Sequence, residues 1–124
     1  KSKKRLVVDI QPDGDLMFDP GALWVAAKYE IPILVVMYNN KSYYNDWEHQ
    51  IRVAKRRGTP EERAYIGMDI QGPDVNFAGL ARSMGWYAEG PIEDGKDVGD
   101  ALRRALKEVK AGRPALVDTV SQFR

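Results

Sequence analysis

Two short apolar runs, each followed by a polar turn, constrain the fold of this chain most. Residues 6–10 (LVVDI) and 33–38 (ILVVMY) are rich in β-branched residues and predict strands. Between them, Asp19 and Pro20 have the composition of a helix start, so a helix is expected over residues 22–29. Pro32 then disfavours helix at the residue before it. The order strand, helix, strand favours a parallel pair of strands.

The rest of the chain continues the alternation of helices and strands. Apolar spacing predicts three more helices. The first starts at Asn45 or Asp46 and ends near Gly58, the second runs from Asp74 to near Gly85, and the third from Asp97 to near Gly112. A capping-box pattern at residues 59–62 predicts the start of one short extra helix, and strands are expected at 86–88 and 115–120. The predicted fold class is therefore α/β, a parallel sheet covered by helices on both faces in three layers, and residues 1–124 form one domain.

Composition excludes several classes of protein. The chain has 44% hydrophobic and 30% charged residues, which is typical of a globular domain. A net charge of +1 does not favour binding to nucleic acid or to an anionic membrane. With no cysteine there are no disulfides or thiolate metal sites. No apolar run has transmembrane length and no signal peptide is visible, so we expect a cytoplasmic protein, and the missing initial Met suggests a piece of a longer one.

The two polar turns should meet at one edge of the sheet. Asp13 lies in the turn P-D-G-D after the first strand, and Asn40 follows the second strand, 27 positions later. The intervening helix runs back roughly 16 Å, and the second strand returns roughly 20 Å. Ligands of parallel α/β sheets bind at the carboxyl ends of the strands. Each turn alone is ordinary, but the pair at this spacing favours a site.

The residue types suit Mg²⁺ bound together with phosphate. Asp13 would supply a charged oxygen, Asn40 a neutral one and Ser42 a main-chain carbonyl. Gly14 would let the backbone approach a phosphate, and the amides of residues 42–45 could donate to the same anion. A calcium loop does not fit because Phe18 and Trp24 stand where it needs Gly and Glu, and no G-x-G-x-x-G dinucleotide motif is present.

The paired turns resemble a known cofactor motif. The segments P-D-G-D-L-M-F and N-N-K-S-Y-Y are similar to the G-D-G…N-N motif of thiamine-diphosphate-dependent enzymes. That motif marks the C-terminal, diphosphate-binding domain of acetolactate synthase, benzoylformate decarboxylase and pyruvate decarboxylase, and the chain most resembles the acetolactate-synthase-like group. Pro12 replaces the first glycine of the motif, which removes one backbone donor but no metal ligand. The resemblance implies Mg²⁺ on Asp13, Asn40 and Ser42, and thiamine diphosphate contacts from Gly14, Asp15, Met17, Tyr43 and Tyr44.

The resemblance also implies what this chain lacks. In this family the cofactor lies between two domains, and the glutamate that activates it belongs to a pyrimidine-binding domain, usually of another subunit. That domain is absent from this chain, so no catalytic residue is assigned here. The implied activity is decarboxylation or carboligation of a small 2-oxo acid by a homo-oligomeric transferase or lyase. Two alternatives stay open: a catalytically inactive α/β interaction module, and a flavodoxin-like nucleotide or phosphate binder.

Overall fold

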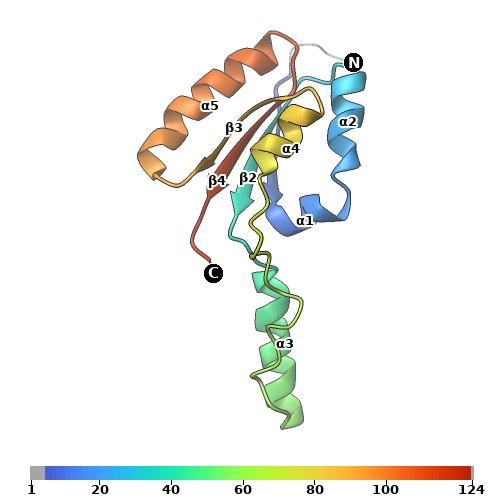
Figure 1. Ribbon diagram of the computed structural model, residues 1–124, viewed down its shortest axis with the longest axis vertical. Helices are drawn as coiled ribbons and strands as arrows, with labels where there is room; N and C mark the ends of the chain where they lie inside the picture. The colour runs from blue at the N-terminus through green and yellow to red at the C-terminus, as the bar shows by residue number, and fades with distance from the viewer. Residues whose placement is uncertain (1–4, 124) are drawn as a thin grey trace.

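Four parallel strands form the centre of the molecule. The structure, a computed structural model, describes residues 5–123. The strands lie side by side in the order β1 (Val7–Pro12), β2 (Ile33–Asn39), β4 (Ala115–Val120) and β3 (Tyr87–Ile92), so that β4 lies between β2 and β3 (Figure 1). All three pairings are parallel, which confirms the predicted α/β class.

The inner strands are apolar because both of their faces are covered. Residues 115–117 of β4 are fully buried, and Met37 of β2 is equally buried. The register pairs Pro12 with Tyr38 and Asn39 with Val120. The carboxyl ends of β1, β2 and β4 therefore lie along one edge of the sheet, as the chain-length argument predicted.

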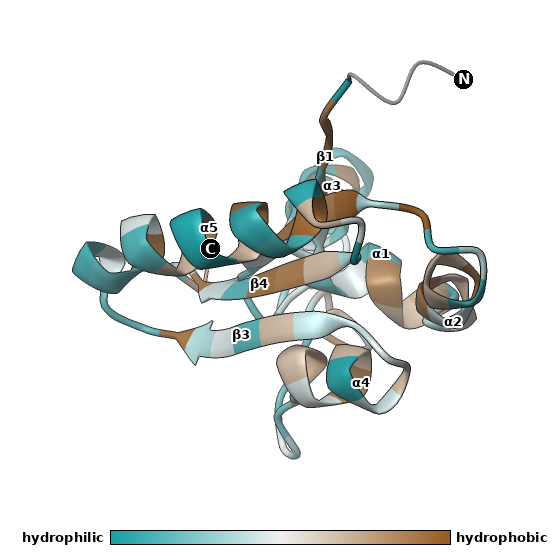
Figure 2. Ribbon diagram, turned by 90° about the horizontal axis from the view of Figure 1, so that it is seen from above, coloured by the Kyte–Doolittle hydropathy of each residue, from teal (hydrophilic) through white to brown (hydrophobic). Residues whose placement is uncertain are grey.

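Helices cover the two faces of the sheet unequally. Helix α5 (Gly95–Lys110) packs on one face of the sheet (Figure 2). Its Ala101, Ala105 and Val109 lie in one buried cluster with Ala115 and Val117 of β4. The opposite face is covered by α1 (Asp13–Phe18), α2 (Gly21–Lys28) and α4 (Phe77–Ser83). This arrangement is the predicted three-layer α/β/α sandwich.

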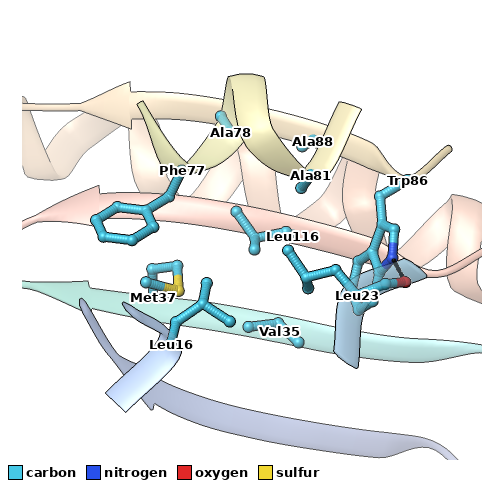
Figure 3. Packing of buried hydrophobic residues seen from close by; sticks show 10 residues of the cluster. All are labelled: Leu16, Leu23, Val35, Met37, Phe77, Ala78, Ala81, Trp86, Ala88 and Leu116. Atoms are coloured by element: carbon cyan, nitrogen blue, oxygen red, sulfur yellow. Dashed lines mark hydrogen bonds between the residues drawn. The ribbon is translucent and has the colours of Figure 1, made fainter. Parts of the chain in front are cut away.

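The larger core lies beneath α1, α2 and α4. Figure 3 shows Phe77, Met37, Leu16 and Leu116 packed between the helices and the sheet. Trp86 closes one end of this core, and its indole nitrogen donates to the carbonyl of Leu23 at 2.6 Å, so its one polar group is satisfied (Figure 3).

Helix α3 (Tyr44–Arg57) projects away from the sheet, and residues 59–71 return beside it (Figure 1). None of its residues is fully buried. At its base Trp47 makes aromatic contacts with Tyr44, Tyr65 and Phe123, at centroid distances of 6.3, 6.4 and 6.2 Å. No helix in the described part of the chain is both long and apolar enough to cross a membrane.

Two segments differ from the sequence expectation. Residues 13–18 were expected to form a loop but form the short helix α1, in which only Leu16 contributes an apolar side chain to the core. Residues 59–62 were expected to form a helix but make turns instead, such as the hydrogen bond from Ala64 N to Glu61 O. Local propensity is a weak guide in such short segments because tertiary contacts decide them.

The starts of the helices also differ, because other residues provide the caps. Asp94, not Asp97, caps α5, and its Oδ1 accepts from Lys96 N at 2.9 Å. Asn76 caps α4, which begins three residues after Asp74. The side chain of Asp19 makes no capping bond to α2, and α3 begins at Tyr44, ahead of Asn45 and Asp46. The stops at Gly58 and Gly85 are confirmed, with positive φ at both.

Candidate functional site

The buried polar side chains of the described chain gather at one place. All of them lie at, or directly after, the carboxyl ends of β1, β2 and β4. A buried polar group costs free energy unless it is paired. A cluster of such groups is therefore better explained by a functional site than by a contribution to stability. The five residues are Asp13, Asn39, Asn40, Ser42 and Asp118.

Asp13 is the most unusual member of this cluster. It is the first residue of α1 and 1% exposed, and neither carboxylate oxygen has a hydrogen-bond partner of good geometry. Burial raises the pKa of Asp13, and the nearby backbone amides of Gly14, Lys41 and Ser42 partly offset that rise. The amides at 41 and 42 come from the loop after β2, so this loop lies against the Asp13 carboxylate.

The loop after β2 makes a tight turn around Asn40. The Oδ1 atom of Asn40 accepts from Ser42 N at 3.2 Å, and Lys41 has a left-handed φ of 58°. The amide oxygen has a second lone pair, so it can still bind a cation. Ser42 is held from the other side, because its Oγ donates to Met68 O at 3.1 Å. The structure therefore brings Asp13, Asn40 and Ser42 to one edge, as predicted.

Tyr43 packs directly over Gly14. A Cβ atom on Gly14 would lie 2.3 Å from Cε1 of the Tyr43 ring, so no other residue fits at position 14 without a shift. The Tyr43 hydroxyl donates to Gly14 O at 3.0 Å and links α1 to the start of α3. Sequence analysis explained Gly14 by the approach of a phosphate, whereas the structure shows a packing reason.

The remaining predicted contacts lie at the same end of the molecule but are less enclosed. Asp15 and Met17 are exposed on α1, and Met17 is 42% exposed. Tyr44 is half-buried and packs edge-on against Trp47. The expectation that the amides of residues 42–45 bind an anion needs a correction for two of them, since Ser42 N donates to Asn40 Oδ1 and Tyr43 N donates to Met68 O at 2.8 Å.

Sequence analysis missed Asp118. This residue is fully buried, and its Oδ1 accepts from Asn39 Nδ2 at 3.0 Å. Burial raises the pKa of Asp118; the bond from Asn39 lowers it, and the charge of Asp13 raises it again. The available signal was an aspartate inside the otherwise apolar run ALVDTV, two residues before the strand ends.

The donors present fit a small, hard divalent cation. Asp13 offers a buried carboxylate without a partner, and Asn40 offers a neutral oxygen beside it. Among residues 5–123 no group of three or more His, Cys, Asp or Glu side chains could hold a metal. A cation here would thus complete its coordination shell with main-chain, water or phosphate oxygens, as Mg²⁺ usually does in proteins.

Comparison with known proteins identifies the family. The profile of the thiamine pyrophosphate enzyme C-terminal, TPP-binding domain matches residues 1–119. The chain belongs to this family, the cofactor-binding domain of thiamine-diphosphate-dependent enzymes. The predicted family and fold are confirmed.

Relatives with curated names and solved structures agree. The chain is 29% identical over 120 residues to a Mycobacterium tuberculosis protein that carries the name of an acetolactate synthase large subunit, covering 94% of the chain and 22% of that protein. It is 27% identical to the sulfoacetaldehyde acetyltransferase of Castellaniella defragrans, covering 82% of the chain and 15% of the enzyme.

The 4-hydroxybenzoylformate decarboxylase of Rhodococcus jostii RHA1, a thiamine-diphosphate-dependent enzyme, superimposes with a TM-score of 0.71 at 25% identity. This superposition covers 99% of the chain and 21% of the enzyme. The chain thus spans only 15–22% of the length of these proteins.

Proposed function

We propose that this chain binds Mg²⁺ and the diphosphate of thiamine diphosphate, as part of an acetolactate-synthase-like enzyme that acts on 2-oxo acids. One observation carries the proposal: in a chain of this family, a buried carboxylate without a partner, Asp13, faces the Asn40 turn. A divalent cation would neutralise that charge and also attract phosphate oxygens.

Each residue of the site would have a distinct role. Asp13 would be the charged ligand, Asn40 Oδ1 a neutral ligand and the carbonyl of Ser42 the third. The backbone of Gly14 and Asp15 would face the diphosphate, with Met17, Tyr43 and Tyr44 beside the cofactor. Thiamine diphosphate supplies the electron sink for breaking or forming a bond next to a carbonyl, while this chain binds and orients it.

The names of the relatives support the reaction class. They include a synthase, an acetyltransferase and a decarboxylase, so decarboxylation or carboligation of a 2-oxo acid fits all of the similarities together. We infer that the remaining machinery, including the activating glutamate, comes from a pyrimidine-binding domain of the same or another subunit. The assembly would be a homo-oligomer, and this chain would contribute no catalytic acid or base.

The test is cofactor binding with and without metal. In the intact protein, with its pyrimidine-binding domain present, thiamine diphosphate should bind in a calorimeter only when Mg²⁺ is added. Asp13→Asn should weaken Mg²⁺ binding by on the order of 100-fold, at or beyond the roughly 10–100-fold typical of outer-shell partners. Without metal, the same variant should be no less stable than the wild type, because it loses a buried charge whose burial the nearby backbone amides only partly offset.

Asp19→Asn is the matched control. Asp19 follows α1, is exposed and makes no capping bond, so this variant should bind Mg²⁺ like the wild type. Metal-independent binding, or wild-type affinity in Asp13→Asn, would refute the ligand assignment. A protein that binds neither Mg²⁺ nor cofactor would instead be an inactive interaction module, and displacement of the cofactor by a nucleotide would favour a nucleotide binder.

A further inference from the structure

We propose that Asp118 is a positioning residue of the cation site: it holds Asn39, and thereby aims the adjoining Asn40 side chain at Asp13. This inference rests on the proposed function, because it concerns the same site. It assigns a role to a buried carboxylate that the ligand set itself does not use.

Asp118 and Asn39 are in direct contact. The Asn39 Nδ2 atom donates to Asp118 Oδ1 at 3.0 Å, across 79 residues of sequence. Asn39 is 4% exposed and Asp118 is fully buried, so water does not compete for this bond. Asn39 is the last residue of β2 and the direct neighbour of Asn40, so a fixed Asn39 side chain limits rotation of the chain where the Asn40 turn begins.

Strand β4 and the residue after it hold the end of β2 through further hydrogen bonds. Ser121 N donates to Asn39 O at 2.8 Å, and the hydroxyl of Thr119 donates to Met37 O. The backbone of β2 is thus fixed by β4, while Asp118 alone fixes the side chain of Asn39 among the hydrogen bonds of residues 5–123. Without Asp118 the strands would still pair, but the Asn39 side chain would lose its partner.

Asp118 is itself held in place by close packing. A Cβ atom on Gly90 would lie 2.6 Å from Asp118 O and 2.7 Å from Asp118 Cβ. The end of β3 therefore presses directly on Asp118, and the glycine makes this approach possible. The remaining oxygen of Asp118, Oδ2, is buried and has no hydrogen-bond partner. This is a costly arrangement for a residue whose only task is to join two strands.

Two variants of Asp118 separate positioning from simple strand packing. Asp118→Asn keeps an oxygen that can accept from Asn39, whereas Asp118→Leu has no acceptor. The probe is Mn²⁺, followed by electron paramagnetic resonance in the intact protein with thiamine diphosphate. We expect the dissociation constant for Mn²⁺ to rise about 10–100-fold in Asp118→Leu and to stay within about threefold of the wild type in Asp118→Asn.

Val117→Ala is the matched control. Val117 is the neighbouring, fully buried residue of β4, but it faces the α5 cluster on the other side of the sheet. This variant should lower the melting temperature and leave Mn²⁺ affinity unchanged. A second measurement is Asn39→Ala combined with Asp118→Leu: if the two residues act through one hydrogen bond, the double variant binds Mn²⁺ no more weakly than the worse single variant.

The outcomes separate the two proposals. If the wild type binds Mn²⁺ and Asp118→Leu binds it equally well, Asp118 has no positioning role, and the proposed function stands. Equal losses in Asp118→Asn and Asp118→Leu would mean that the charge matters and not the bond to Asn39, which also overturns positioning. A Val117→Ala loss as large as that of Asp118→Leu would show a general packing effect. A wild type without Mn²⁺ binding would overturn the proposed function and this inference together.

Discussion

Two positions on β4, Leu116 and Asp118, lie two residues apart on the same face of the strand and have opposite surroundings. Leu116 is fully buried among apolar side chains of α4 and β2 (Figure 3). Asp118 is equally buried, yet one of its oxygens has no partner, and both oxygens of the nearby Asp13 are also unpartnered. Burial of apolar side chains stabilises the core, whereas burial of Asp13 and Asp118, the polar edge, destabilises the fold. We infer that the edge is built for binding.

The largest expected effect is on the core side of this comparison. Leu116→Ala should lower the free energy of unfolding by about 2–5 kcal/mol, because it leaves a cavity between α4 and the sheet. Urea denaturation measures this loss. The protein that remains folded should bind Mg²⁺ with unchanged affinity, and a loss below about 1 kcal/mol would mean that the core does not depend on this residue.

Gly14→Ala tests where the core and the edge meet. The new methyl group would overlap the Tyr43 ring, so the free energy of unfolding should fall by about 1–3 kcal/mol. Gly95→Ala is the control, because Gly95 starts α5 with no atom near its would-be Cβ, and this variant should be neutral or slightly stabilising. Equal effects of the two substitutions in thermal melts would contradict the packing of Tyr43 on Gly14.

The two carboxylates of the polar edge, Asp13 and Asp118, should affect how stability depends on pH. Burial raises the pKa of both Asp13 and Asp118 above their ordinary value of 3.8, so the folded state holds protons more tightly than the unfolded state. Their contribution to stability is full below the ordinary pKa and is lost as the pH rises through the raised values. In metal-free protein, Asp13 and Asp118 should therefore contribute increasing stability as the pH falls from neutral into this window.

A double variant isolates this contribution. Thermal melts of Asp13→Asn/Asp118→Asn should lack the gain on acidification that the metal-free wild type shows. If Asp13 binds Mg²⁺ as proposed, saturating Mg²⁺ should reverse the trend in the wild type, because protons would compete with the metal for Asp13. Identical pH profiles for the wild type and the double variant would show that these carboxylates do not behave as described.

The smallest effect is expected for an ion pair away from both regions. Arg104 of α5 donates two hydrogen bonds to Glu89 of β3, at 2.9 and 2.6 Å, and lowers the pKa of that carboxyl. Its contribution to stability is therefore lost as the pH falls through the lowered pKa, opposite in sign to the edge. Glu89→Gln should cost about 0.2–1 kcal/mol in urea denaturation, because Arg104 is largely exposed. A loss above about 2 kcal/mol would mean that the pair contributes to stability as a buried ion pair does.

The sequence predicted the parts of the fold that follow from regular periodicity. The apolar run of β2, the helical spacing of α5 and the return of Asn40 to the edge beside Asp13 were all found as expected. Helix α1 was not predicted, because a six-residue segment with one core residue carries no periodic signal. Asp118 was missed since its meaning depends on strand order, which places the end of β4 beside Asn39, 79 residues earlier.

The position of β4 between β2 and β3 has a consequence for the order in which the protein is built. During synthesis β1 and β2 are made early, but the strand that joins them to β3 is the last of the four. Closing so long a loop is entropically costly and therefore slow. A nascent chain that has completed β2 already carries Asp13 and Asn40, yet it lacks the strand that anchors Asn39. We expect the candidate site to be completed only after β4 has left the ribosome.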